Sequence, residues 1–193
     1  YFHMKNINIS KNILHWYDNN KRILPWRKNV SLKKKQYYTL VSEFMLQQTQ
    51  VITVVPFFNR FISNIPSLQS LANIKEKKLI KLWEGLGYYS RARNLKKTSQ
   101  IIIKNFKGKI PDNFDDLKTL PGIGDYTASA ILAIAFNKPF IPLDGNIERV
   151  LKRYLYLKKE NEIKKDNLQD KKRIFGISKR SNDYAQALME LGA

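Results

Sequence analysis

The chain has 193 residues, with 35 lysines and arginines against 16 acidic residues, which gives a formal charge of +19. It contains no cysteine, which excludes disulfides and any thiolate metal or iron–sulfur site within these residues. The sequence has no apolar run of about 18 residues and no signal-peptide pattern, so we expect a cytoplasmic chain without a membrane partner. The charge predicts a polyanionic partner, although the frequent Lys, Ile and Asn could also reflect a biased genome.

Apolar periodicity predicts an all-α fold of roughly ten short helices, with no strand and no internal repeat. The expected helices cover residues 10–20, 38–55, 57–64, 67–72, 75–84, 90–105, 114–120, 125–136, 146–155 and 181–191. Pro25 makes residues 23–27 a non-helical elbow, because proline disfavours helix at the residue before it. The lysines at 33–35 indicate a solvated loop, and the charged residues 158–172 indicate either a loop or an exposed helix.

Residues 120–131 read as a tight turn at 121–124 followed by the first turns of a helix. Gly122 and Gly124 allow the backbone a positive φ and a close approach to a neighbour. Asp125 can cap the helix, whose first N–H groups have no acceptor within it and can bind a phosphate. The turn alone would equally suit an ordinary helix–turn–helix corner.

Two carboxyl groups stand in settings that suit the cleavage of a glycosidic bond. Glu43 shares a helical face with Leu46, Gln47 and Gln50. Apolar surroundings there would keep the carboxyl of Glu43 protonated and ready to donate, whereas the ordinary alternative is an exposed helical glutamate. Asp144 lies at a loop-to-helix junction, where a carboxylate can stabilise a developing cation but is also a common helix cap. An acid and an anion in divided roles are what glycoside cleavage requires.

Aromatic and basic residues lie close together in the sequence at two places. One is the stretch 85–94, which contains Tyr88, Tyr89, Arg91 and Arg93. A tyrosine here could wedge into a base stack while the arginines contact phosphates, or it could be a core residue. Trp26 and Arg27 offer a stacking surface with a positive charge, although a tryptophan in an elbow is more often part of the core. No metal-ligand cluster is apparent, since His3 and His15 lack carboxylate partners at ligand spacing.

Four motifs in this order resemble those of the adenine DNA glycosylase family, called MutY, a branch of the helix-hairpin-helix superfamily of base-excision enzymes. They are Ser-Glu-Phe-Met-Leu-Gln-Gln-Thr-Gln-Val at 42–51, Trp-Glu-Gly-Leu-Gly-Tyr-Tyr-Ser-Arg at 83–91, Leu-Pro-Gly-Ile-Gly-Asp-Tyr-Thr-Ala-Ser-Ala at 120–130 and Leu-Asp-Gly-Asn at 143–146. The resemblance runs almost end to end, from Leu-Pro-Trp-Arg at 24–27 to Ala-Leu-Met-Glu-Leu-Gly-Ala at 187–193.

The resemblance implies a DNA enzyme that removes adenine mispaired with 8-oxoguanine or guanine. Glu43 matches the general acid that protonates the adenine ring, and Asp144 matches the carboxylate that stabilises the sugar oxocarbenium ion, directly or through a transient covalent adduct. Tyr126 and Asn146 match residues that support this carboxylate. The pocket for the flipped adenine is matched by Arg22, Trp26, Arg27, Leu46 and Gln186. The DNA contacts are matched by Gln48 and Tyr88, which enter the opened base stack, and by Gly122 and Gly124, which grip a phosphate through backbone N–H groups.

Tyr126 stands where bifunctional relatives resembling endonuclease III carry a lysine that forms a Schiff base and supports strand cleavage. The resemblance therefore implies a monofunctional glycosylase. Thymine-mismatch glycosylases also have tyrosine here and are the nearest alternative, but Glu43 and the Leu-Gln-Gln run at 46–48 are more similar to the adenine enzymes. A catalytically impaired DNA-binding fragment is a second alternative, and a basic helical protein that binds RNA nonspecifically is a third.

Members of the MutY family continue into a four-cysteine segment that holds a [4Fe–4S] cluster and then into a domain that recognises 8-oxoguanine. This chain ends at Ala193, so we expect a truncated fragment or a pseudogene-like product without a cofactor. It opens with Tyr1 and has its first methionine at Met4, which also indicates a fragment.

The resemblance implies two helical lobes with the active site in the cleft between them. Residues 30–140 should form a helical barrel that contains the hairpin, and residues 1–29 together with 141–193 should form the other lobe. We expect a monomer that binds double-stranded DNA with a flipped adenine, at the nucleoid of a bacterial-type cytoplasm.

Overall fold

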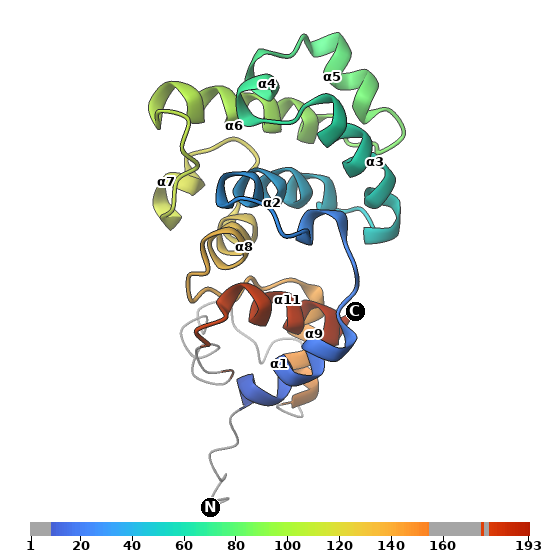
Figure 1. Cartoon of the computed structure of the whole chain (residues 1–193), viewed down its shortest axis with the longest axis vertical. Helices are drawn as coiled ribbons and strands as arrows, with labels where there is room; N and C mark the ends of the chain where they lie inside the picture. Colours follow the sequence, from blue (N-terminus) through green and yellow to red (C-terminus); the bar gives the residue numbers. More distant parts are fainter. Residues whose placement is uncertain (1–8, 155–174, 176–177) are drawn as a thin grey trace, which may run out of the picture. The chain divides into compact units, whose positions relative to one another are not determined.

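The computed structural model describes residues 9–154, 175 and 178–193, which form helices and turns without a strand (Figure 1). The helices are α1 Ile9–Asn20, α2 Leu32–Leu46, α3 Val51–Asn64, α4 Leu68–Asn73, α5 Glu76–Trp83, α6 Ser90–Asn105, α7 Phe114–Lys118, α8 Asp125–Phe136, α9 Gly145–Tyr154 and α11 Ser181–Gly192. One turn of 3₁₀ helix, Pro25–Arg27, precedes α2. The all-α prediction is confirmed. Within the described residues, no helix combines the length and the apolar character that crossing a membrane would need.

The chain divides into two compact units, one of residues 1–22 with 132–193 and the other of residues 23–131. Both boundaries lie earlier in the chain than residues 29/30 and 140/141, where the sequence analysis puts them. The second boundary falls within the residues of α8.

In the unit of residues 23–131, α2 is the central helix and packs against α3, α6 and the 3₁₀ turn. Leu40, Val41 and Phe44 on α2 are fully buried, as expected of a helix that is covered on most sides. The lysines at 33–35, expected in a loop, instead form the first turn of α2, since lysine is a good helix former and can extend into water.

The prediction of one continuous helix over residues 38–55 is wrong. The helix ends at Leu46, Gln48 takes a positive φ of 57°, and Gln50 is the N-cap of α3. Gln50 therefore does not share the helical face of Glu43. Pro56 lies inside α3 rather than ending it. Because proline has no N–H, the carbonyl one turn earlier has no hydrogen-bond donor at this position. Pro56 is exposed, so this carbonyl lies on the solvent side of the helix.

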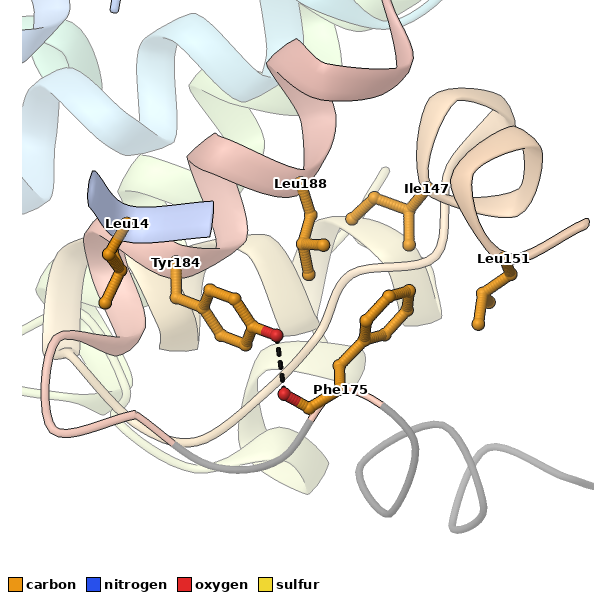
Figure 2. Packing of buried hydrophobic residues seen from close by; sticks show 6 residues of the cluster. All are labelled: Leu14, Ile147, Leu151, Phe175, Tyr184 and Leu188. Atoms are coloured by element: carbon orange, nitrogen blue, oxygen red, sulfur yellow. Dashed lines mark hydrogen bonds between the residues drawn. The ribbon is translucent and has the colours of Figure 1, made fainter. Parts of the chain in front are cut away.

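The other unit is built around a core to which α1, α9 and α11 contribute (Figure 2). Its buried members are Leu14, Ile147, Leu151, Phe175, Tyr184 and Leu188. The hydroxyl of Tyr184 donates to the carbonyl of Phe175 at 2.5 Å, so this buried polar group is satisfied inside the core. The charged stretch 158–172 lies outside the described residues.

Candidate active site

Glu43 lies on α2 and is only 4% exposed. The alternative of an exposed helical glutamate is therefore wrong. Its sequence neighbours Ser42 and Phe44 are buried as well, so this part of α2 is enclosed on successive faces. A carboxyl enclosed in this way is shielded from bulk water, which suits a group that donates a proton directly to a bound partner.

The end of α2 is tied to the hairpin turn. The side-chain amide of Gln47 donates to the carbonyl of Gly122 at 3.1 Å and to the hydroxyl of Thr127 at 3.3 Å. Leu46, the last residue of α2, is half-buried, and Gln48 is exposed. The sequence analysis assigned no role to Gln47, because a single amide side chain carries no sign of a partner 75 residues away in the chain.

The hairpin turn itself depends on Gly122. Gly122 has a φ of +79°, and a Cβ there would lie 2.9 Å from the ring of Phe44 and 3.0 Å from the Cβ of Asn94. Gly124 has no positive φ, and a Cβ there would meet no atom within 4 Å. The fold therefore explains the glycine at 122 but not the one at 124. That Gly124 admits the close approach of a phosphate stays a prediction.

This difference between the two glycines gives a testable prediction. Replacing Gly122 by alanine should destabilise the protein by about 1–3 kcal/mol, since it forces a Cβ into a strained and crowded position. Replacing Gly124 by alanine should leave the thermal midpoint unchanged but weaken duplex DNA binding roughly tenfold, measured by fluorescence anisotropy. Equal loss of stability in the two variants would contradict this assignment.

Asp125 is the first residue of α8 rather than its cap, and its carboxylate pairs with Lys118. The expectation that Asp125 caps α8 is therefore wrong, because the side chain points to a cation on the preceding helix. Tyr126 follows as the second residue of α8 and is half-buried.

Asp144 immediately precedes α9 and caps it. Its Oδ1 accepts from the N–H of Ile147 at 2.8 Å, and its Oδ2 accepts from the side-chain amide of Asn146 at 3.2 Å. Burial raises the pKa of Asp144 above its ordinary value, and these two hydrogen bonds oppose that shift. The cap and the proposed catalytic anion are thus compatible, since the same carboxylate is held in one orientation by donors on α9.

The start of α9 also contacts the end of α11. Arg149 donates to the side-chain oxygen of Asn146 at 3.1 Å and to the carbonyl of Gly192. A Cβ on Gly192 would overlap the backbone carbonyl of Asn146, so only glycine permits this approach. The sequence pattern does not indicate this packing, which lies next to Asp144 at the start of α9.

The five residues assigned to the adenine pocket divide between the two units. Trp26, Arg27 and Leu46 belong to the unit of residues 23–131, and Arg22 and Gln186 belong to the other. The ring of Trp26 packs edge-on against Phe58 at 5.2 Å between centroids and remains half-buried. The backbone N–H of Arg22 donates to Glu190 at 3.2 Å, and the amide of Gln186 donates to the carbonyl of Asn182 at 3.0 Å. That these side chains line one pocket stays a prediction.

Of the tyrosines and arginines that the sequence analysis names between 85 and 94, two are exposed and one arginine is buried. Tyr88 is 63% exposed, and Arg93 is exposed with its guanidinium 2.8 Å from Glu76, which lowers the pKa of that glutamate. Arg91 is only 6% exposed. The expectation that Arg91 contacts phosphate is wrong, because its guanidinium is enclosed by backbone carbonyls of this chain.

Among residues 9–154, 175 and 178–193, no group of three or more His, Asp or Glu side chains is arranged to hold a metal ion. The sequence supplies no cysteine for a [4Fe–4S] cluster, so these 193 residues do not fit the cluster that the MutY resemblance implies.

The family model of HhH-GPD superfamily base excision DNA repair proteins matches residues 41–174. An adenine DNA glycosylase of Buchnera aphidicola subsp. Baizongia pistaciae is 42% identical over 184 residues, which are 94% of this chain and 51% of that protein. One of Rattus norvegicus is 40% identical over 190 residues, which are 95% of this chain and 37% of that protein. The chain thus spans about half the length of the bacterial relative, and less of the mammalian one.

Solved structures share the fold. A thermostable thymine-DNA glycosylase matches with a TM-score of 0.81 at 24% identity, over 95% of this chain and 84% of that one. A trapped endonuclease III–DNA covalent intermediate matches with a TM-score of 0.74 at 20% identity, over 94% of this chain and 81% of that one. The helix-hairpin-helix glycosylase fold is therefore confirmed.

Proposed function

Because the chain belongs to the HhH-GPD superfamily of base excision DNA repair proteins, we propose that it removes adenine mispaired with 8-oxoguanine or guanine by hydrolysing the N-glycosidic bond. The observation that carries the proposal is the burial of Glu43, which gives the acid for this reaction a site shielded from water. The specificity for adenine is supported by relatives named adenine DNA glycosylase that match most of the chain.

In the proposed reaction, Glu43 protonates the adenine ring, and the departing base leaves a positively charged sugar. Asp144, ionised and oriented by Asn146 and the N–H of Ile147, stabilises this cation. Protonation of the leaving group and stabilisation of the cation need opposite charge states of two carboxyls. The hydrogen bonds that Asp144 accepts favour its ionised form, and Glu43 is the more buried of the two carboxyls.

The substrate in this proposal is double-stranded DNA with the target adenine flipped out of the helix, since the bond cannot be reached inside the base stack. The hairpin at Gly122 and Gly124 anchors a phosphate through backbone N–H groups. The side chains that contact the flipped adenine are Trp26, Arg27, Leu46, Arg22 and Gln186. The chain acts as a monomer, at the nucleoid of a bacterial-type cytoplasm.

Single-turnover incubations with three duplexes test the proposal: adenine opposite 8-oxoguanine, adenine opposite guanine, and thymine opposite guanine. We expect adenine release from the first two and no thymine release from the third. Release of thymine would favour a thymine-mismatch glycosylase. Binding of all three duplexes without release of any base would favour a catalytically impaired DNA-binding fragment.

Tyr126 makes a further prediction about the reaction. A tyrosine cannot form a Schiff base with the sugar, so base removal should not be coupled to strand cleavage. Borohydride added during turnover of adenine-containing DNA should trap almost no protein–DNA adduct, as judged by denaturing gel electrophoresis. The variant Tyr126→Lys is the matched positive control for trapping. Efficient trapping by the unaltered protein would overturn the prediction.

A further inference from the structure

The guanidinium of Arg91 is enclosed by the end of α2 and the segment that follows it. It donates to the carbonyl of Met45 at 2.7 Å, to the carbonyl of Gln47, and to the hydroxyl of Thr49 at 3.0 Å. These acceptors lie at the C-terminal end of α2, where the last carbonyls have no partner within the helix and a positive charge is favoured. Arg91 itself is in the first turn of α6, more than 40 residues further along the chain.

The same guanidinium also holds the loop that precedes α6. It donates to the carbonyls of Leu86 at 3.0 Å and Gly87 at 3.2 Å, and its Nε lies 3.5 Å from the carbonyl of Tyr88. Its central carbon lies 5.5 Å from the ring centre of Tyr88 and 5.6 Å from that of Trp83, both within cation–π range. One side chain therefore joins two segments, residues 45–49 and residues 86–88.

Each of these segments carries a residue in a backbone conformation that its type rarely adopts. Gln48 has a φ of 57° and Tyr88 a φ of 45°. The residue after a helix end often has a positive φ, but glycine or asparagine usually occupies it, and Tyr88 does not follow a helix end. Both side chains are exposed, so contacts of their own side chains with a core do not impose these conformations. We therefore attribute the positive φ values to the backbone on either side of each residue, and the side chain of Arg91 binds the backbone of both segments.

We propose that Arg91 is a positioning residue that holds Gln48 and Tyr88 together as a preformed pair of wedges for opening the base stack. The proposal rests on the function proposed above and on the family resemblance, which matches Gln48 and Tyr88 to residues that enter the opened base stack. Arginine suits this task because its planar guanidinium has five N–H donors that can satisfy several carbonyls at once. Burial lowers the pKa of Arg91, but an arginine remains charged, so its hydrogen bonds stay charge-assisted.

The variant Arg91→Lys tests the proposal, with Lys97→Arg as the control because Lys97 is on the same helix but exposed. Both variants keep the positive charge, but the lysine at 91 cannot bridge both segments. We expect faster amide hydrogen exchange at both 47–49 and 86–88 in Arg91→Lys and at neither in Lys97→Arg. Faster exchange in only one segment, or in neither, would contradict the proposal that Arg91 holds both segments in place.

A functional readout separates positioning from general stability. Two substrates are compared in single turnover: adenine opposite 8-oxoguanine in an intact duplex, and adenine in an unpaired bulge, where little stack has to be opened. Arg91→Lys should lower the rate roughly 10–10²-fold on the duplex and less than about threefold on the bulge. Equal losses on the two substrates would indicate a purely structural role and would overturn the proposal.

The two proposals can fail separately. Opening of the stack is followed without chemistry by the fluorescence of 2-aminopurine placed beside the target adenine, in proteins that also carry Glu43→Gln. If the protein without these substitutions releases no adenine, but Arg91→Lys still abolishes the fluorescence rise that Lys97→Arg retains, the wedge proposal stands and the proposed reaction is wrong. If Arg91→Lys does not fold, Thr49→Val removes one acceptor only and should give the same pattern at smaller size; an unchanged Thr49→Val would then overturn the proposal.

Discussion

Replacing Glu43 by glutamine is expected to abolish adenine release while leaving duplex binding intact. Glutamine has nearly the same shape but cannot donate a proton to the departing base, and general acid catalysis contributes roughly 10²–10⁴-fold to the rate. The loss should appear in the single-turnover rate on adenine opposite 8-oxoguanine, with little change in the dissociation constant. Since the side chain is 4% exposed, a neutral amide at this place should not lower the thermal midpoint.

The control for this experiment is Glu84→Gln. Glu84 is exposed at the end of α5, where its carboxylate lies 2.5 Å from the ammonium of Lys81, which lowers the pKa of Glu84. Removing this solvated charge should leave the rate unchanged. An unchanged rate in Glu43→Gln as well would remove the main support for the proposed reaction, and a different proton donor would have to be found.

Sequence periodicity predicted most helices because the apolar residues and the stop signals agree. The helices expected at 90–105 and 125–136 match α6 and α8. The first follows Gly85 and Gly87, both with positive φ, and the second follows the turn at Gly122. In each case the local sequence contains the reason for the boundary, so no long-range information was needed.

The break between α2 and α3 could not be predicted in the same way. Every residue from 42 to 55 is compatible with a helix, and the chain leaves the helix at Gln48 where Arg91 binds the carbonyl of Gln47. That contact joins positions 44 residues apart and has no local sign. The same holds for Gly192 against Asn146, since the need for a glycine depends on a packing neighbour in another helix.

The candidate site was predicted as a set of residue types, and the structure adds their local settings. Periodicity placed Glu43 on a helix but could not say that its carboxyl is enclosed, because burial depends on which helices pack around α2. For Asp144, the cap and the catalytic anion were alternatives in the sequence, whereas the geometry at the start of α9 satisfies both.

Replacing Asp144 by asparagine is expected to remove activity, because the variant lacks the negative charge that stabilises the sugar cation. The loss should be roughly 10²–10³-fold in the single-turnover rate, the range for removing one preorganised electrostatic partner. The asparagine oxygen can still accept from the N–H of Ile147, so α9 keeps its cap and DNA binding should persist. Asp115→Asn, at an exposed carboxylate in the first turn of α7, should keep full activity.

The same substitution should alter stability in a way that depends on pH. Burial raises the pKa of Asp144, so the folded state binds this proton more tightly than the unfolded chain does. The stabilisation from this group is therefore complete below its ordinary pKa and is lost as the pH rises through the raised value. At neutral pH the ionised Asp144 costs stability, and Asp144→Asn removes that cost.

Asparagine also loses the hydrogen bond that Asn146 donates to Oδ2. In the unaltered protein this bond favours the ionised carboxylate, but the pKa of Asp144 is raised even with the bond present, so the direction of the pH effect is unchanged. The thermal midpoint of Asp144→Asn relative to that of the unaltered protein should therefore be higher at pH 7 than at about pH 3.5, just below the ordinary pKa of aspartate. Calorimetry at the two pH values measures the change. If the difference in thermal midpoint between the variant and the unaltered protein is the same at both pH values, burial does not destabilise the ionised form of Asp144. The carboxylate would then be oriented toward the sugar cation without lowering the stability of the folded state.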